Sequence, residues 1–156
     1  MDLTNKVSLI TGAGQGIGEG IARTLAAQGS KVILVDLNAD SAGKVAHDIN
    51  DEFSGSALSF EADLTDSKAI SAMLAFGKTH FNKIDCICNN AAASKGIGPI
   101  ENYSLNEVQA TLDLTFTSLW KCLQAEVMFL KEQSTPASIV NISSNSAIHG
   151  YAFNSI

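Results

Sequence analysis

Residues 11–18 read Thr-Gly-Ala-Gly-Gln-Gly-Ile-Gly and join a short apolar run, Val7–Thr11, to a segment with helical periodicity. Gly12 would permit a tight turn from strand to helix, Gly16 would let the backbone approach a pyrophosphate, and Gly18 would let the helix pack closely against the strand. The start of such a helix offers free N–H groups and about half a positive charge. The pattern therefore predicts a dinucleotide-binding turn, with an ordinary structural turn as the alternative.

Short apolar runs alternate with amphipathic segments along the rest of the chain. The runs predict strands at Val7–Thr11, Lys31–Asp36, Ala57–Glu61, Ile84–Asn89 and Ser138–Ser143. Near-continuous apolar strands separated by helices are typical of a parallel sheet covered on both faces. With right-handed crossovers, the sequence predicts an α/β doubly wound fold in one domain spanning residues 1–156. The usual order 3-2-1-4-5-6 would stop at strand 5 here, which would leave an apolar edge strand.

Cap residues and apolar spacing predict the helices between these strands. The first helix has Ile17, Ile21 and Leu25 on one face and stops at Gly29. The others are a helix after Asn38 or Asp40 with Val45 and Ile49 inward, a helix capped by Thr65 with Ile70, Met73 and Leu74 inward, and a long helix begun by a Ser104–Glu107 capping box with Val108, Leu112, Leu119 and Leu123 inward.

Composition excludes several functional classes. The chain has 16 acidic and 10 basic residues, a net charge of −6, and no Lys/Arg cluster that could neutralise several phosphates, so nucleic-acid binding is not expected. No apolar run is long enough for a membrane span, and the N-terminus lacks the basic-then-apolar order of a signal peptide. These features indicate a soluble, cytoplasmic protein.

Cysteine and histidine spacing gives no indication of a metal site. Cys86 and Cys88 lie two residues apart in an apolar strand, where they would serve as small hydrophobic residues, and Cys122 stands alone. The three histidines are scattered along the chain without ligand spacing. No metal is expected.

Two later motifs complete a family pattern. Asn89-Asn90-Ala91-Ala92 follows the fourth predicted strand, and Ile-Val-Asn-Ile-Ser-Ser occupies residues 139–144. Together with the glycine turn, they resemble the short-chain dehydrogenase/reductase family, with Ala92 in place of the glycine of its Asn-Asn-Ala-Gly motif. The resemblance covers Lys6 to Ile156 and implies an oxidoreductase that interconverts a secondary alcohol and a ketone with a nicotinamide cofactor.

The family performs this reaction with a serine, a tyrosine and a lysine. The resemblance assigns the serine to Ser144, and the family spacing places the tyrosine just beyond Ile156. Tyr151 is too close to Ser144 to replace it, and Ser155 occupies the position where a lysine would then be required. By themselves, two serines at the end of a strand usually form only a turn.

The resemblance also implies the cofactor. Asp36 ends the second strand, where a carboxylate can accept both ribose hydroxyls and repel a 2′-phosphate: two unit charges about 4 Å apart cost about 4 kcal/mol at an effective dielectric constant of about 20. Relatives that use NADP usually place Arg or Lys at positions held here by Gln15 and Leu37, so NAD is expected. The implied contacts are Gly12, Gln15, Gly16, Ile17, Gly18, Asp36, Leu37, Asp63, Leu64 and Asn90.

Several of these assignments have structural alternatives. Asp36 can be a solvated strand-end residue, and Asp63, implied to meet the adenine amine alongside Leu64, can instead cap a helix. Asn89 is at least as plausibly structural as ligand-binding, because a buried amide must satisfy its hydrogen bonds. Thr115 stands where relatives have an asparagine that holds a water in the proton relay, so that relay is in doubt.

Two other functional classes remain open at this point. The chain can be an NAD-binding module without turnover, acting as a sensor or subunit, or a structural partner that pairs its fifth strand with another chain. Relatives commonly dimerise through the long helix after the fourth strand and through the helix that carries the tyrosine and lysine, so a homodimer or homotetramer is expected. No residue identifies the alcohol or ketone substrate.

Overall fold

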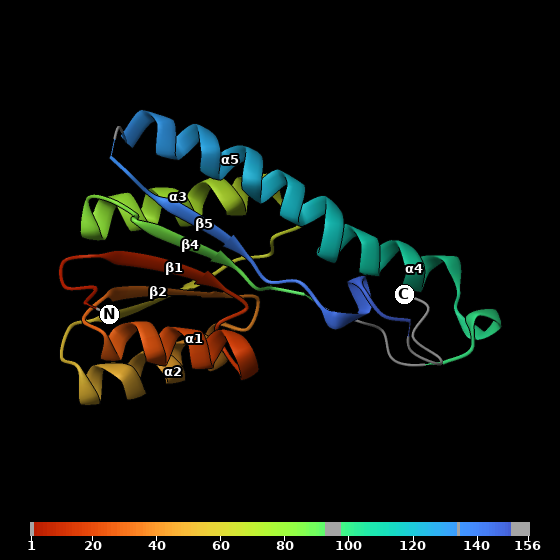
Figure 1. Ribbon diagram of the computed structural model, residues 1–156, viewed down its shortest axis with the longest axis horizontal. Coiled ribbons are helices and arrows are strands. Elements are labelled where there is room, and N and C mark those ends of the chain that lie inside the picture. Colours follow the sequence, from red (N-terminus) through yellow and green to blue (C-terminus); the bar gives the residue numbers. More distant parts are fainter. Residues whose placement is uncertain (1, 93–97, 134, 151–156) are drawn as a thin grey trace.

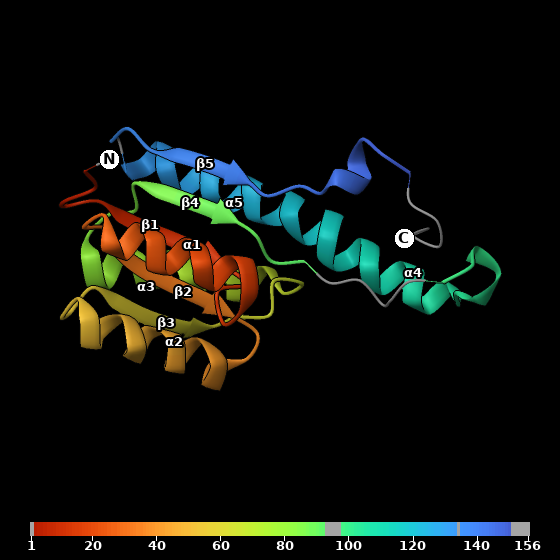
Figure 2. The same ribbon diagram turned by 60° about the horizontal axis from the view of Figure 1, so that its bottom comes forward.

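A five-stranded parallel sheet forms the centre of the computed structural model, which describes residues 2–92, 98–133 and 135–150. The strands are β1 (Val7–Thr11), β2 (Lys31–Asp36), β3 (Ala57–Glu61), β4 (Cys86–Asn89) and β5 (Ser138–Asn141). Their order in the sheet is β3-β2-β1-β4-β5, as Figure 2 shows. This confirms the predicted doubly wound α/β fold and strand order.

Helices cover both faces of the sheet (Figure 1). One layer contains α1 (Gly16–Ala27) and α2 (Ala39–Glu52), and the other contains α3 (Ser67–Phe81) and α5 (Ser118–Gln133). Each layer has its own hydrophobic core. Leu9 and Ile87 belong to the core under α3 and α5, whereas Ile10 and Leu34 belong to the core over α1 and α2. Alternation of side chains along each strand supplies both cores from one sheet.

The packing face of α1 differs from the predicted apolar face. Its fully buried residues are Gly18, Ala22 and Ala26, whose small side chains allow the helix to lie close to the sheet. Ile21 and Leu25 pack at the margin of the core, and Ile17 is 68% exposed. The strict apolar spacing therefore identified a helix but not the residues that face the sheet.

Side-chain caps fix the starts of three helices. Asn38 accepts a hydrogen bond from the Ser41 amide and begins α2, while Ser104 and Glu107 form the predicted capping box of α4 (Leu105–Leu112). The cap of α3 is Asp66, which accepts from the Lys68 amide, so the prediction of Thr65 was wrong. Thr65 instead bonds to Asp63 in the preceding turn.

The predicted long helix is interrupted by a π-helical turn. The turn η2 (Asp113–Thr117) lies between α4 and α5 and shifts the helical phase. The residues buried along this segment are Thr111, Ser118, Cys122 and Glu126. Val108, Leu119 and Leu123 are only half-buried and Leu112 is exposed, so the predicted inward face was wrong.

The strands β4 and β5 are both shorter than predicted. β4 begins at Cys86 rather than Ile84, although Ile84 remains fully buried, and β5 ends at Asn141 rather than Ser143. The Ile142 amide still donates to the Asn89 carbonyl at 2.8 Å, so pairing persists one residue beyond β5. A single turn, η3 (Asn145–Ala147), follows.

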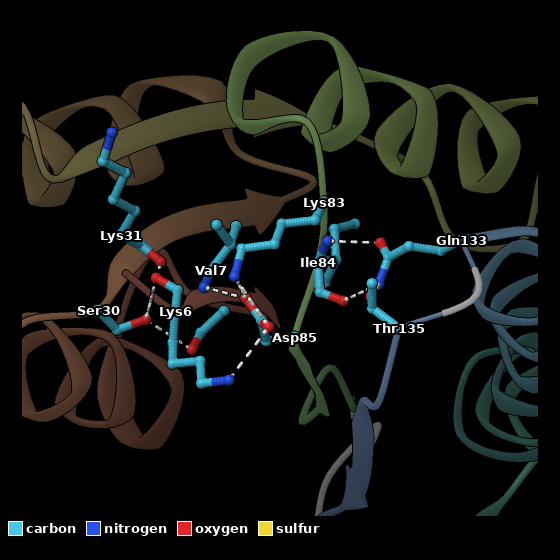
Figure 3. A network of polar contacts seen from close by, with 10 residues as sticks. Lys6, Val7, Ser30, Lys31, Lys83, Ile84, Asp85, Gln133 and Thr135 are labelled. Atoms are coloured by element: carbon cyan, nitrogen blue, oxygen red, sulfur yellow. Dashed lines mark hydrogen bonds and ion pairs between the residues drawn. The ribbon is translucent and has the colours of Figure 1, made fainter. Parts of the chain in front are cut away.

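Polar contacts join the elements at the amino-terminal ends of the strands (Figure 3). The carboxylate of Asp85 accepts from the Val7 amide at 2.9 Å and from the ammonium groups of Lys83 and Lys6. The side-chain amide of Gln133, at the end of α5, both accepts from the Ile84 N–H at 2.8 Å and donates to the Ile84 carbonyl at 2.9 Å. These contacts lie at the opposite end of the strands from the glycine turn, which follows the carboxyl end of β1.

Within the described ranges, no helix is long and apolar enough to cross a lipid bilayer.

Candidate functional site

The glycine turn has the backbone that its sequence predicts. Gly12 and Gly16 have φ angles of +63° and +59°, a region that favours glycine. A Cβ on Gly18 would collide with the Gly12 carbonyl, so Gly18 allows α1 to pack against the turn. A Cβ on Gly16, in contrast, would meet no atom within 4 Å. Gly16 therefore faces open space at the start of α1.

The first turn of α1 has no side-chain cap. Gln15 occupies the N-cap position in an extended conformation and makes no capping hydrogen bond. The starts of α2, α3 and α4 are all capped by side chains. The N–H groups at the start of α1 therefore remain available to an anionic ligand.

Asp36 is held at the end of β2 by backbone donors. Its Oδ2 accepts from the Gly14 amide at 2.8 Å, and its Oδ1 accepts from the Asn38 amide at 2.9 Å. A Cβ on Gly14 would lie 2.9 Å from Asp36 Oδ2, so a side chain there would displace the Asp36 carboxylate. The role of Gly14 was not predicted, although its place within the glycine turn was visible in the sequence.

Asp63 lies in the turn before α3 but does not cap that helix, whose N-cap is Asp66. The Oδ1 of Asp63 accepts from the backbone and hydroxyl of Thr65 at 2.9 and 2.7 Å, which shapes the turn before α3. These hydrogen bonds, from the Thr65 side chain first and then its backbone, lower the pKa of Asp63, with a smaller contribution from the charge of Lys121. Asp63 is thus a carboxylate that faces the cleft described below.

A latch between two loops fixes the floor of the site. The Thr11 hydroxyl oxygen accepts from the amides of Asn90 and Ala91 at 3.0 and 3.1 Å. The Asn90 side chain donates back to the carbonyls of Thr11 and Gly12 at 3.0 and 3.2 Å. Asn90 therefore holds the glycine turn in place as well as lining the site. Thr11 was missed as a site residue, although it immediately precedes the glycines.

A cleft of about 500 Å³ runs over the carboxyl ends of β1, β2 and β3. All the predicted cofactor residues except Gly18 line it, and Gly18 lies beneath the turn. The complete lining is Gly12, Gln15, Gly16, Ile17, Val35, Asp36, Leu37, Ala62, Asp63, Leu64, Asn90, Ala91, Ala92 and Leu114. None of these described lining residues is basic. We call this hollow the nucleotide cleft.

A second cleft, of about 630 Å³, adjoins the first over the ends of β4 and β5. We call it the serine cleft, because Ser143 and Ser144 line it. It shares Ile17, Leu64 and residues 90–92 with the nucleotide cleft, so the two form a continuous surface. The Ser144 hydroxyl oxygen accepts from the Ser146 amide at 3.1 Å, which leaves its hydrogen available for donation.

The π-helical turn contributes the opposite wall of the serine cleft. Thr115 and Ser118 both line this wall. The Thr115 hydroxyl donates to the Thr111 carbonyl at 2.6 Å, and the Ser118 hydroxyl donates to the Leu114 carbonyl. Each hydroxyl therefore presents only an acceptor to the cleft. Thr115 can accept from a water but has no hydrogen left to donate to one.

Some predicted features lie elsewhere. Tyr151 and Ser155 lie outside the described residues. Among the residues that are described, no group of three or more His, Cys, Asp or Glu side chains could hold a metal ion. The three cysteines are free thiols, and burial raises the pKa of Cys122 to about 12.

Comparison with known proteins identifies the family. A model described as short chain dehydrogenase matches residues 6–156. The chain belongs to this family. Short-chain dehydrogenases among its relatives include the 2,3-dihydro-2,3-dihydroxybenzoate dehydrogenase of Bacillus subtilis strain 168, 34% identical over 145 residues that cover 93% of this chain and 54% of the relative.

Two further proteins show how much of the family fold is present. The 2,5-dichloro-2,5-cyclohexadiene-1,4-diol dehydrogenase of Sphingobium indicum is 30% identical over 96% of this chain and 58% of its own length. A crystal structure titled NAD+-bound xylitol dehydrogenase matches with a TM-score of 0.91 and 27% identity, covering 98% of this chain and 58% of that one. The chain thus spans a little over half the length of these short-chain dehydrogenases.

Proposed function

We propose that the protein containing this chain is an NAD-dependent oxidoreductase that interconverts a secondary alcohol and a ketone. The observation that carries the choice of NAD is the position of Asp36. Two backbone amides aim its carboxylate at the nucleotide cleft, whose described lining residues include no cation. A 2′-phosphate at that position would meet a negative charge without a compensating cation.

The residues around Asp36 suit a dinucleotide. The uncapped start of α1 would donate N–H groups to the phosphates, and the open space at Gly16 would admit them. Asp36 would accept hydrogen bonds from the ribose hydroxyls, and Asp63 would accept a hydrogen bond from the adenine amine. Bound NAD would supply the hydride acceptor for the reaction.

Ser144 is the proposed catalytic residue of this chain. Its hydroxyl hydrogen, left free by the bond from the Ser146 amide, would be donated to the substrate oxygen. The tyrosine and lysine that the family pattern places after Ile156 would take up the alcohol proton in the full-length protein. Thr115 would contribute a single water acceptor in place of the asparagine of its relatives.

The names of the relatives suggest a class of substrate. Several of them are dehydrogenases of cyclic diols, including the Bacillus subtilis and Sphingobium indicum proteins. The serine cleft combines apolar walls at Leu119 and Ile142 with the hydroxyls of Ser143 and Ser144. Such a lining fits a hydroxylated ring, so cyclic diols are the first compounds to assay with NAD.

The outer face of the long helix supports a homo-oligomer. Phe116 and Trp120 are each 67% exposed, and Leu112 and Met128 continue the same stripe. Figure 1 shows this helix extending beyond the sheet, where a second copy has access to it. Leu112, Phe116 and Trp120 are spaced four residues apart and Met128 follows eight residues after Trp120, so apolar side chains recur along one exposed side of the helix and offer a surface for packing.

The test of the cofactor assignment is the variant Asp36→Ala. We expect it to weaken NAD binding by at least about tenfold, because it removes a charged acceptor of the ribose hydroxyls. The gap between NAD and NADP should narrow at the same time. Asp40→Ala, which removes the same charge from a nearby exposed position, is the control. Tighter binding of NADP than NAD by the unmodified full-length protein would overturn the assignment.

A further inference from the structure

A carboxyl group lies buried where α5 crosses the ends of β4 and β5. Glu126 is 0% exposed, and its Oε2 accepts a hydrogen bond from the Asn89 side-chain nitrogen at 3.0 Å. The same nitrogen donates to Asn141 Oδ1 at 3.0 Å. One cluster, Glu126–Asn89–Asn141, therefore joins a helix to two strands. A buried carboxylate destabilises the fold unless hydrogen-bond donors or an opposite charge offset its lost hydration. A single hydrogen bond from a neutral amide offsets little of that cost.

The unpaired atoms of this cluster are complementary. Among the described residues, the buried side-chain oxygen and nitrogen atoms that lack a partner are Glu126 Oε1 and Asn89 Oδ1. They are the second carboxyl oxygen of Glu126 and the amide oxygen of Asn89, on the two side chains that already share a hydrogen bond. With Glu126 ionised, both atoms are acceptors without a donor. One proton on Glu126 Oε1 provides the donor that Asn89 Oδ1 lacks, and the acid and the amide then share two hydrogen bonds.

Among the described residues, no cationic side chain pairs with Glu126. Cys122, one turn earlier on α5, is a buried thiol, and the Asn89 and Asn141 side chains on β4 and β5 are neutral. The charged side chains of α3, which also packs on α5, are exposed: Lys68, Lys78 and His80. Burial raises the pKa of Glu126 to about 7, opposed by the hydrogen bond from Asn89.

The cluster borders the serine cleft. Asn89 and Asn141 both line the serine cleft. Asn89 precedes Asn90 of the latch, and its carbonyl accepts from the Ile142 amide at 2.8 Å, two residues before Ser144. A shift of Glu126 relative to Asn89 would therefore move residues on both sides of the site.

We propose that Glu126 is a neutral carboxylic acid in the folded protein and acts as a positioning residue that fixes the ends of β4 and β5 beneath Ser144. The protonation state stands on the cluster alone, whereas the effect on Ser144 rests on the function proposed above. Ionisation of Glu126 removes the donor to Asn89 Oδ1 and places an unpaired charge in the core. The cluster then loosens as the pH rises.

The variant Glu126→Gln tests the protonation state without depending on catalysis. Its amide offers Asn89 the same donor and acceptor as the neutral acid but does not titrate. In the unfolded chain Glu126 ionises near its ordinary pKa of about 4.3. Because the folded value is raised, the wild type should lose stability relative to Glu126→Gln as the pH rises from about 4.3 to about 7, and the difference should then level off.

Chemical denaturation of the full-length protein across this pH range measures the difference, with Glu52→Gln, an exposed carboxylate on α2, as the control. Carbon NMR of the side-chain carboxyl groups provides a direct reading, because Glu126 should remain protonated above the ordinary glutamate pKa of about 4.3. A pH-independent stability difference, together with a Glu126 carboxyl that titrates with the exposed ones, would overturn the neutral acid.

Turnover tests the positioning role separately. The kcat of the wild type should fall above about pH 7 relative to that of Glu126→Gln, as Glu126 ionises. Superimposable pH profiles, with the neutral acid confirmed by NMR, would overturn the positioning role. If no NAD-linked turnover is found at all, the proposed function fails, while the denaturation and NMR results still decide the protonation state. Glu126→Ala should lose stability and turnover at every pH, and if it does not fold, Glu126→Gln still decides both points.

Discussion

At the scale of single residues, the four glycines of the turn do different work. Gly12 and Gly16 supply a backbone that other residues adopt only with strain, whereas Gly14 and Gly18 leave room for Asp36 and for the Gly12 carbonyl. Gly16 alone among them faces open space. Glycine is therefore favoured by conformation at Gly12 and Gly16, and by close packing at Gly14 and Gly18.

The distinction can be tested at Gly16. We expect Gly16→Val to lower NAD affinity by at least about tenfold, because its side chain would fill the space next to the start of α1. The strained φ angle should also cost about 1–2 kcal/mol of stability. Gly20→Val, one turn further along α1 and also in open space, is the matched control and should leave affinity unchanged. An unaltered NAD affinity in Gly16→Val would show that the turn is only structural.

Site residues were predictable where their role depends on the backbone. The glycine turn, Asp36 at the strand end and Asn90 were all placed by motif and strand position, and they meet in one cleft. Thr11 and Glu126 were not identified, because their roles depend on partners 79 and 37 residues away in the chain. A hydroxyl before a glycine or a lone glutamate within a helix gives no signal of a distant amide.

At the scale of secondary-structure elements, strands were easier to predict than helix faces. The bounds of β1, β2 and β3 agree with the prediction, and for β1 and β2 the reason is that a strand buried on both faces is a nearly continuous apolar run. The packing faces of α1 and α5 differ from it. Alanine and glycine bring α1 close to the sheet, and the π-helical turn rotates α5 relative to α4. Neither effect changes the local spacing of apolar residues.

The carboxylate of Asp85 ties the starts of β1 and β4 together. Burial alone would raise the pKa of Asp85, but hydrogen bonds from Lys83 and the Val7 amide, with the charges of Lys83 and Lys6, lower it overall. A lowered pKa means that this stabilisation is present above the unfolded pKa of about 3.9 and is lost as the pH falls through the folded value. The carboxylate thus contributes to stability at neutral pH and not in strong acid.

We expect Asp85→Asn to lower the free energy of unfolding by about 1–3 kcal/mol at neutral pH, because an amide nitrogen would then face the donors of Val7 or Lys83. The difference from the wild type should shrink below about pH 4. Urea denaturation at several pH values measures it. Asp51→Asn, which breaks the exposed pair with His47, is the control and should have little effect. A penalty that does not change with pH would show that Asp85 acts without its charge.

At the scale of the whole molecule, the two ends of the parallel strands differ in what they carry. At the amino-terminal ends of the strands, the ion pairs of Asp85 and the side-chain amide of Gln133 join neighbouring elements (Figure 3). The carboxyl ends of the strands carry the two clefts and the latch. The long helix extends beyond the sheet on the same side (Figure 1). Ligands of doubly wound sheets bind at the carboxyl ends of the strands, where the loops are free to vary.

The exposed helix stripe predicts the assembly of the protein. We expect Trp120→Glu to shift the full-length protein toward monomer, weakening self-association by about a hundredfold, since a large apolar contact is replaced by an unpaired charge. Sedimentation velocity over a range of concentrations measures this shift. Thr24→Glu adds the same charge to exposed α1 and should have no effect. A monomeric wild type would exclude this interface.

The position of β1 in the sheet has a consequence for synthesis on the ribosome. β1 emerges first, yet it pairs on one side with β2 and on the other with β4, which is made about 80 residues later. Until then one of its edges has no neighbour, and the Thr11 hydroxyl lacks the amides of Asn90 and Ala91 that it later accepts from. The nucleotide cleft therefore cannot mature in step with translation. It is completed late, after the chain has been made as far as Leu114, which lines the cleft together with the segment that follows β4.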